Sequence, residues 1–215
     1  MSARALLRAG GARPLPGSFY DRAADLVARD LLGAVLVHRS PDGVASGRIV
    51  EVEAYMGPHD PACHAAAGLT QRTRPLFGPP GMSYVYFIYG NHWCVNAVTR
   101  EAGYGAAVLI RALEPLKGIP LMQRRRPLAR RVTDLANGPG KLCSALGIDA
   151  GHNARSLQQG TLRILTGERV VDDDVRVSPR VGITKAAGEM LRFYIVDNEC
   201  VSRVPASISG RAARL

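Results

Sequence analysis

The sequence is poor in cysteine and has no long apolar run, and each shortage excludes a class of protein. Its 215 residues include four cysteines, which lie far apart and form no CxxC pair, so a disulfide-stapled scaffold is not expected. No apolar stretch reaches the roughly 18 residues that a membrane helix needs. The N-terminus lacks the long apolar segment of a secretion signal. We therefore expect a soluble intracellular protein without membrane attachment, whose cysteines are structural thiols.

Acidic side chains are also scarce relative to basic ones. Asp and Glu together number 18 against 28 Lys and Arg, which gives a formal net charge of +10. An excess of this size is typical of a protein that binds a polyanion, most simply nucleic acid. A basic protein that is merely soluble would have the same composition. Nearly all of the basic residues are arginine, the side chain best suited to bidentate phosphate contact.

Two basic segments are candidates for phosphate contact. The run Gln123–Arg131 contains Arg124 and Arg125, and it fits a solvated surface as well as a phosphate-binding one. The segment Asn137–Leu142 resembles a P-loop but lacks its first glycine and its Ser or Thr. We interpret it as the start of a helix, whose free amide groups and Lys141 could hold one phosphate.

Apolar periodicity and turn residues predict a single domain of mixed α/β (α+β) structure. The expected helices are 21–33, one opening at Glu114-Pro115 and shortened or kinked by Pro120, and 139–146; the expected strands are 34–38, 44–54, 82–89, 92–98, 106–113, 162–165, 175–177 and 191–196. Residues 1–17 are basic and rich in small residues, so we expect a flexible arm there. The domain should span residues 18–205, and residues 206–215 should form a tail.

The predicted strand at residues 44–54 has an unusual polar face. Because side chains alternate between the two faces of a strand, Glu51, Glu53 and Tyr55 should share one face with Ile49, opposite an apolar face. A long loop, Met56–Gly81, follows this strand, and long loops at strand ends often carry binding sites. This pattern favours the wall of a cleft, although an ordinary solvent-facing strand would have the same alternation.

A second hairpin follows that loop. Two β-rich runs meet at a Gly-Asn pair, which is a strong hairpin signal. Tyr84 and Tyr86 should face one way, Val85 and Phe87 should face the core, and Tyr89 should lie at the tip. Buried tyrosines need hydrogen-bonding partners for their hydroxyl groups, so the tyrosine face is a candidate binding surface.

Several kinds of catalysis can be set aside before carboxylate chemistry. The His and Cys residues within 59–64 fit no recognised zinc spacing, and there is no GxSxG nucleophile motif. Glu51 and Glu53 remain, with Cα atoms roughly 7 Å apart along one strand face. One of them could activate water for attack on a sugar carbon. Arg111 interrupts an apolar strand and needs a carboxylate or a bound anion as partner. The residues therefore favour a metal-free hydrolase of a nucleic-acid glycosidic bond.

The motifs of the chain match, in order over residues 18 to 204, those of a known family. They are GRIVEVEAY (47–55), GP (57–58) followed by His64, PG (80–81) leading to YVYFIYG (84–90), CVN (94–96), VLIRALEP (108–115), GPGKLC (138–143), RVGI (180–183) and LRFY (191–194). On these motifs the chain resembles the alkyladenine DNA glycosylases, also called 3-methyladenine DNA glycosylases of the mammalian type.

The resemblance implies a fold and a role for several residues. The fold would be a curved antiparallel sheet with surrounding helices and a protruding β-hairpin that enters the DNA minor groove. Glu53 would be the general base that deprotonates the attacking water. Arg111 and the backbone at Ile183 would position that water.

The resemblance also implies a pocket for a flipped base. Tyr55 and Tyr86 would stack on the base, and His64 would recognise its edge through hydrogen bonding. Asn96 would disfavour the exocyclic amine of guanine. Tyr89 would fill the gap that the base leaves in the duplex. The sequence departs from the family pattern just after that tip, where it has Asn91 and His92 in place of larger apolar and aromatic residues.

The implied activity is that of a monofunctional DNA glycosylase of base excision repair. It would act as a monomer, without a cofactor, on double-stranded DNA containing damaged purines such as 3-methyladenine, 7-methylguanine, hypoxanthine or ethenoadenine. Its place would be the bacterial cytoplasm, associated with the nucleoid, or the nucleus in a eukaryote. A non-catalytic nucleic-acid-binding domain, or a glycosidase of another class that uses Glu51 and Glu53 as a pair, remain the alternatives.

Overall fold

A computed structural model describes residues 11–204 and 211–215, and in this part of the chain every ladder belongs to one antiparallel sheet. The strand order is β3-β4-β5-β2-β8-β7-β9, with β1 pairing both β2 and β6. The strands are β1 Val35–Ser40, β2 Gly43–Tyr55, β3 Ser83–Ile88, β4 His92–Thr99, β5 Ala106–Lys117, β6 Leu162–Leu165, β7 Val175–Ser178, β8 Arg192–Ile195 and β9 Ala213–Arg214.

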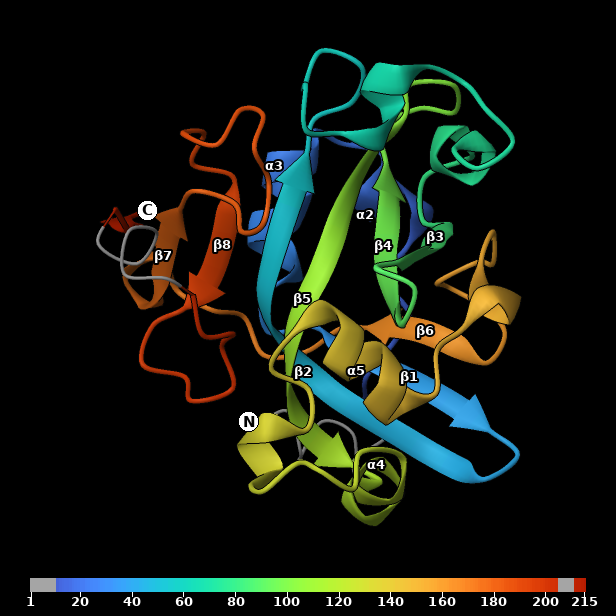
Figure 1. The fold of residues 1–215 in the computed structure, drawn as a ribbon, viewed down its shortest axis with the longest axis vertical. Coiled ribbons are helices and arrows are strands. Elements are labelled where there is room, and N and C mark those ends of the chain that lie inside the picture. The colour runs from blue at the N-terminus through green and yellow to red at the C-terminus, as the bar shows by residue number, and fades with distance from the viewer. Residues whose placement is uncertain (1–10, 205–210) are drawn as a thin grey trace.

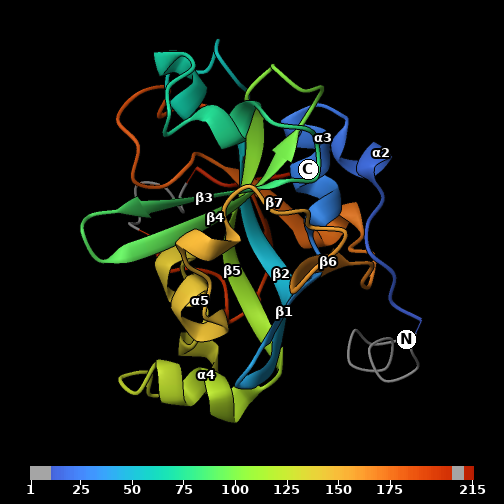
Figure 2. The same ribbon diagram turned by 90° about the vertical axis from the view of Figure 1, so that its right-hand side faces the viewer.

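Helices cover both sides of the central strands β2 and β5. Figure 2 shows α3 on one side of them and α5 and α4 on the other. The α-helices are α2 Gly17–Tyr20, α3 Ala24–Leu31, α4 Ile119–Arg125 and α5 Pro139–Leu146, and short 3-10 helices are η1 His64–Ala67, η2 Arg74–Phe77, η3 Val132–Asp134, η4 Ala150–His152 and η5 Asp172–Asp174. The prediction of a single mixed α/β domain around an antiparallel sheet is thereby confirmed (Figure 1).

The pairing of the longest strand, β2, with β5 is irregular beside the two glutamates. Ile49 lies opposite Leu113, Glu51 opposite Ala112 and Val52 opposite Ile110, so that Val50 on β2 and Arg111 on β5 are each skipped in this ladder. Ile49 packs in the apolar core. Neither glutamate is exposed to solvent, so the reading of a solvent-facing strand was wrong.

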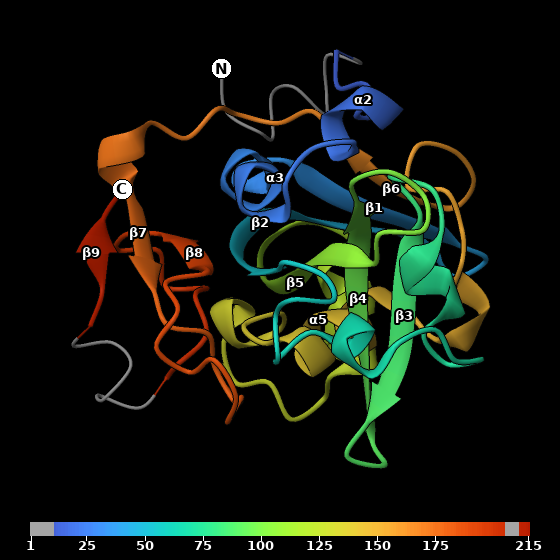
Figure 3. The same cartoon turned by 90° about the horizontal axis from the view of Figure 1, so that it is seen from above.

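The hairpin β3–β4 projects from the body of the molecule (Figure 3). Its register pairs Tyr86 with Cys94 and Phe87 with Trp93. We expected Phe87 in the core, but 44% of its surface is exposed. It packs only across the hairpin, with its ring centroid 4.7 Å from that of Trp93. The outer face of a projecting hairpin has no second layer to cover it, which explains the difference.

Pro115 and Pro120 act differently from our expectation. Glu114 and Pro115 do not open a helix but continue β5, where Pro115 lies at a register shift of the β2–β5 ladder that tolerates its missing N–H group. The helix begins only after Gly118, whose φ of +76° turns the chain. Pro120 then falls in the first turn of α4, where a proline neither breaks nor kinks a helix.

The termini and the long loop are more ordered than the sequence suggested. Arg13 and Leu15 are paired by backbone hydrogen bonds with the strand β6 region, which contradicts a flexible arm as far as residue 17. The tail adds strand β9 to β7. The remainder of both predictions falls on residues 1–10 and 205–210, outside the described residues. The loop 56–81 contains η1 and η2.

Two further findings concern the expected cysteine chemistry and membrane attachment. All four cysteines are buried free thiols. Among the residues that the structure describes, none of the helices has the length and apolar character required to cross a membrane.

A buried histidine gives the fold a pH dependence. His38 donates from Nδ1 to the carbonyl of Leu146 (2.7 Å), and its Nε2 lies 2.9 Å from Nε2 of His152. In the neutral form of His38, Nε2 accepts a hydrogen bond from His152. Burial lowers the pKa of His38. The hydrogen bond to Leu146 opposes this shift, and the charges of His152 and Arg125 add to it.

We expect the protein to lose stability as the pH falls below the ordinary histidine pKa of about 6.5. Because the pKa of His38 is lower in the folded protein, the unfolded chain takes up the proton first, and stability is complete only above that pH. His38→Asn keeps a donor for Leu146 but cannot titrate. Thermal unfolding between pH 7.5 and 5.5 should therefore depend less on pH in this variant, even though it is less stable at pH 7.5. An unchanged pH dependence would contradict the assignment.

Candidate active site

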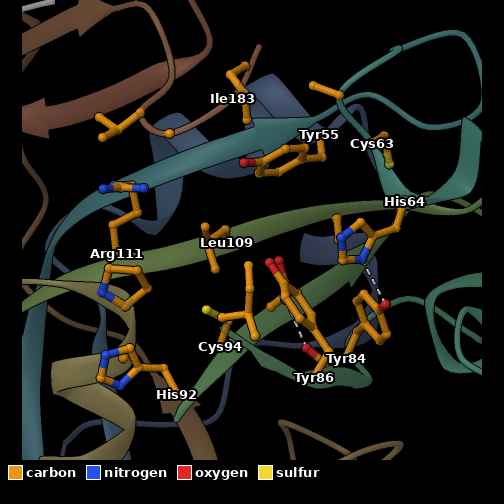
Figure 4. A pocket seen from close by; sticks show the side chains of 18 of the residues that line it. Tyr55, Cys63, His64, Tyr84, Tyr86, His92, Cys94, Leu109, Arg111 and Ile183 are labelled. Atoms are coloured by element: carbon orange, nitrogen blue, oxygen red, sulfur yellow. Dashed lines mark hydrogen bonds between the residues drawn. The ribbon is translucent and has the colours of Figure 1, made fainter. Parts of the chain in front are cut away.

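A cavity of about 390 Å³ lies where the end of β2, the hairpin, the start of α5 and the segment Arg180–Ile183 meet. Its volume falls in the range of small-ligand sites. The side chains and backbone that line it are Tyr55, Ala62, Cys63, His64, Leu76, Tyr84, Tyr86, Ile88, Tyr89, His92, Cys94, Asn96, Ala107, Leu109, Arg111, Pro139, Gly140, Val181, Gly182 and Ile183. Eight of the residues singled out from the sequence are among them: Tyr55, His64, Tyr84, Tyr86, Tyr89, Asn96, Arg111 and Ile183. Figure 4 shows Tyr55 and Tyr86 on opposite sides of this space.

One wall of the cavity is aromatic. The helix η1 brings His64 against the hairpin, where its ring centroid is 4.6 Å from that of Tyr86 and its Nδ1 is 2.9 Å from the hydroxyl of Tyr84. Burial lowers the pKa of His64, and the charge of Arg72 lowers it further. His64 is therefore neutral at physiological pH, which suits a hydrogen bond to a base edge. Tyr86 keeps its proton because burial raises its pKa.

Asn96 is fixed by its own hairpin. Its side chain is buried, and its amide nitrogen donates to the backbone carbonyl of Tyr84 at 2.9 Å. Since the two residues are direct partners in the β3–β4 ladder, the strand register determines where Asn96 lies in the cavity wall. A flat base entering the cavity would meet this amide group in a fixed orientation.

Glu53 lies directly behind the cavity wall. It has no exposed surface, and three groups contact its carboxylate. The amide of Val181 donates to Oε1 (2.6 Å), the hydroxyl of Tyr55 donates to Oε2 (3.0 Å), and Nη1 of Arg111 forms an ion pair with Oε1 (3.2 Å). All three groups also line the cavity. Because each carboxylate oxygen can accept about two hydrogen bonds, Oε2 keeps one acceptor position beside the Tyr55 hydroxyl.

Tyr55 has two possible functions in this arrangement. Burial raises the pKa of its hydroxyl, and the negative charge of Glu53 raises it further. The phenol therefore stays protonated and donates to the carboxylate. Its ring forms the wall opposite Tyr86, so the same side chain contacts both the carboxylate and the space for a ligand.

Glu51 serves a different purpose from Glu53. It accepts from Nε of Arg111 (2.9 Å) and Nε of Arg192 (2.7 Å), and from both the amide (2.7 Å) and hydroxyl (2.8 Å) of Ser202. Burial alone would raise its pKa, but the two guanidinium groups outweigh burial and lower it. Like Glu53 it is wholly buried and is not a lining residue, but two of the three residues that donate to it, Arg192 and Ser202, do not line the cavity either. A glycosidase that uses both glutamates as a pair is therefore disfavoured.

Arg111 links the two glutamates. Burial would lower its pKa, but the charges of Glu53 and Glu51 outweigh burial and raise it, so it is a permanent cation. The sequence required such a partner for an arginine in an apolar strand, and the structure supplies two carboxylates. Nη1 of Arg111 faces Glu53 while Nε faces Glu51, so Glu51 orients Arg111 toward the cavity.

Tyr89 lies at the hairpin tip in a strained conformation. The turn is centred on Tyr89 and Gly90, with φ of +54° and +70°, and is closed by a hydrogen bond from the amide of Asn91 to the carbonyl of Ile88. It thus lies one residue before the Gly-Asn turn that we expected. Positive φ at a non-glycine residue costs on the order of 1–3 kcal/mol. The strained turn holds the tyrosine outward, with 78% of its surface exposed.

The candidate phosphate contacts have different surroundings. Arg125 donates to the carbonyl of Leu146 (2.7 Å), to Ser40 (3.0 Å) and to Asp42 (3.0 Å). It holds the C-terminal end of α5 and is not free for phosphate, which corrects our expectation. Arg124 is exposed on α4. Lys141 is exposed in the first turn of α5 and donates to Asn137 at 2.7 Å.

Sequence reasoning missed two features of the site. The backbone amide of Val181 donates to Glu53, a contact that we did not predict, and Ile183, whose backbone we expected to position the water, lines the cavity. His92 also lines the cavity, because Gly140 allows α5 to approach it: a Cβ atom at residue 140 would lie 2.8 Å from its ring. The RVGI motif (180–183) indicated that this segment belongs to the site, but not that the Val181 amide contacts Glu53. In the described residues, no group of three or more potential ligands is placed to hold a metal ion.

Comparison with known proteins gives a consistent result. The model of the family described as methylpurine-DNA glycosylase matches residues 18–199. Over 194 residues the chain is 47% identical to a protein of Myxococcus xanthus, covering 89% of this chain and 94% of that protein. Over 196 residues it is 50% identical to a protein of Methanoculleus marisnigri, covering 88% and 98%. Both relatives carry the name "Putative 3-methyladenine DNA glycosylase".

Proposed function

Since this chain belongs to the methylpurine-DNA glycosylase family, we propose that it hydrolyses the N-glycosidic bond of a damaged purine with a water molecule that Glu53 activates. It is a DNA-3-methyladenine glycosylase, a DNA-binding hydrolase of DNA repair. The proposed substrates are 3-methyladenine, 7-methylguanine, hypoxanthine and ethenoadenine in double-stranded DNA. The protein would act on them as a monomer.

The observation that supports this mechanism is the position of the three groups that contact Glu53. Tyr55, Arg111 and Val181 each line the cavity and contact the carboxylate. Only these cavity-wall residues separate Glu53 from a bound molecule. A general base must lie within hydrogen-bond reach of the proton it removes, and we place the attacking water at the acceptor position left on Oε2.

The reaction begins when the damaged nucleotide leaves the duplex. Unstacking costs a few kcal/mol and is least unfavourable for a damaged base. The base enters between Tyr55 and Tyr86, where its faces stack and its edge meets His64 and Asn96. Figure 4 shows these two side chains on opposite sides of the cavity.

Bond cleavage then follows from the position of Glu53. The N-glycosidic bond breaks, its electron pair leaves with the base, and the sugar develops oxocarbenium character. A water molecule attacks the anomeric carbon and gives its proton to Oε2 of Glu53. The products are a free base and an abasic site. Alkylated purines suit this scheme because a positive charge on the base improves it as a leaving group.

A base-release assay on a panel of duplexes tests the proposed function. Each duplex would carry one of the four lesions, and an undamaged duplex of the same sequence would be the control. We expect release from at least one alkylated duplex and none from the control. Binding without release from any lesion would instead identify a non-catalytic nucleic-acid-binding domain and overturn the proposal.

We expect Tyr89→Ala to slow base release from duplex DNA by about tenfold or more. Tyr89 would fill the gap left by the flipped base, so its loss removes part of the compensation for unstacking, and a tenfold effect corresponds to about 1.4 kcal/mol. The measurement is the single-turnover rate at saturating protein. A single strand with the same lesion has no duplex stack in which a gap could open. The variant should therefore release the base from it at the wild-type rate.

Leu26→Ala is the matched control for Tyr89→Ala. Leu26 is also a large exposed apolar side chain, but it lies on α3, on the other side of the central strands from α5. Its variant should release bases at the wild-type rate. An unchanged duplex rate for Tyr89→Ala would contradict the wedge role.

A further inference from the structure

A fully buried ion pair, Arg180 with Asp60, lies next to the cavity and has no part in the mechanism above. The side chain of Arg180 has 0% of its surface exposed and that of Asp60 has 1%. Their contact is bidentate: Nη1 of Arg180 contacts one carboxylate oxygen, and Nη2 contacts the other at 2.8 Å. Burying two charges is costly unless their geometry is excellent and their other hydrogen-bonding groups are satisfied. A buried pair of this kind therefore suggests a structural or functional role.

Asp60 organises the loop that leads from Tyr55 to His64. Its carboxylate accepts the backbone amides of Met56 (3.1 Å) and Ala62 (3.0 Å). These bonds close the loop immediately after Tyr55 and fix the chain just before η1, which carries His64. The loop is therefore folded around the carboxylate to which Arg180 is bound.

Arg180 contacts Tyr55 from outside the cavity. Its guanidinium carbon lies 4.8 Å from the centroid of the Tyr55 ring, and of the two residues only Tyr55 lines the cavity. Nη1 of Arg180 also donates to the carbonyl of Ala54 at 3.0 Å. The ring that would stack on a base is thus held from behind by a buried cation.

Arg180 also begins the segment that donates to Glu53. The next residue is Val181, whose amide contacts Oε1 of Glu53 at 2.6 Å, and Val181 to Ile183 form part of the cavity wall. Any movement of Arg180 would move this amide. One ion pair therefore fixes both the ring that contacts the base and a donor that orients the carboxylate.

We propose that Arg180 and Asp60 are a positioning pair, which locks the Tyr55 wall and the Val181 amide into one rigid unit around Glu53. The pair touches neither the base nor the water. It acts by fixing the position of the stacked base relative to the Glu53 carboxylate. A displacement of about 1 Å between reacting groups can lower the rate on the order of 100-fold. This inference rests on the proposed function, because it assumes that Tyr55 stacks on a base and that Glu53 activates water.

Two variants test the pair. Arg180→Lys keeps the charge but cannot contact both oxygens of Asp60 and the Ala54 carbonyl at once. The double variant Arg180→Met with Asp60→Asn removes both charges, so that no buried ion is left unpaired if Arg180→Lys fails to fold. Arg29→Lys is the control, since Arg29 pairs with Asp172 at the surface, away from the cavity.

The experiment separates positioning from stability and from DNA binding. Each folded variant, confirmed by circular dichroism below its melting temperature, would be assayed for single-turnover base release at saturating protein. Affinity would be measured for a duplex containing a stable abasic analogue, which offers no base to Tyr55. We expect at least a tenfold slower release in Arg180→Lys or in the double variant, with affinity for abasic DNA within threefold of wild type.

Each other outcome overturns the inference. Release less than tenfold slower would show that the pair does not position the site. A matching loss of affinity for abasic DNA would show a general effect on the fold or on DNA binding. Absence of base release by the wild-type protein in the same assay would instead count against the proposed function, so the two failures can be told apart.

Discussion

Glu53→Gln is expected to lower the single-turnover rate of base release by about 1000-fold, or about 4 kcal/mol, while leaving the affinity for lesion-containing DNA close to that of the wild type. The amide cannot take a proton from water. It can still satisfy its neighbours, because its oxygen can accept from Val181 and Arg111, and its NH2 group can donate to the hydroxyl of Tyr55. The fold and the cavity should therefore persist while the chemistry is lost.

The control for this variant is Glu114→Gln. Glu114 is a glutamate on β5, the strand that pairs with β2, but it contacts Arg48 and Asn198 and does not line the cavity. Its variant should release bases at the wild-type rate. Full activity of Glu53→Gln in the same assay would rule out Glu53 as the activator of water.

Glu51→Gln is expected to have the largest effect on stability, a loss of about 3–5 kcal/mol in the free energy of unfolding. The substitution removes the negative charge that pairs with the buried guanidinium groups of Arg111 and Arg192. Removing one partner of a buried ion pair destabilises a protein by this amount because the other charge stays buried without compensation. For a chain of this size the melting temperature should fall by roughly 10 °C. Differential scanning calorimetry at neutral pH would measure the change.

The same variant has a second signature in its pH dependence. In the folded protein the pKa of Glu51 lies below the ordinary value of 4.5 for a glutamate. The stability that it contributes is therefore complete above about pH 4.5 and is lost as the pH falls through the lowered pKa. The difference between wild type and variant should shrink on acidification over that range. Glu114→Gln, which breaks a partly exposed pair, should lose less than about 1 kcal/mol; an equal loss in the two variants would contradict the role given to Glu51.

Local sequence patterns were sufficient to predict the pieces of this site. The alternation along residues 44–54 put Glu53 and Tyr55 on one face of a strand, and the β-rich runs after residue 82 predicted the hairpin with Tyr89 at its tip. These features depend on a few neighbouring residues, so they can be read from a short stretch. The helix 139–146 was predicted with its observed bounds, because Pro139 and Gly147 mark both of its ends.

The contacts that join these pieces could not be predicted in the same way. The amide of Val181 reaches Glu53 from 128 positions away, and Arg180 reaches Asp60 from 120 positions away. No spacing rule connects residues so distant, since their meeting depends on the whole sheet topology. The irregular pairing at Val50 and Arg111 escaped prediction for a related reason: it becomes visible only when β2 is set against β5.

Ser202 donates two hydrogen bonds to Glu51, and its late position in the chain affects when the site can form during translation. It lies 151 positions after Glu51, and a ribosome adds about 5–20 residues each second. Glu51 is therefore synthesised on the order of ten seconds before Ser202, and the hairpin with its tyrosines is also made before Ser202. During synthesis the nascent chain carries an incomplete charge cluster, and the ability to remove bases from DNA should appear only once residue 202 has left the ribosome.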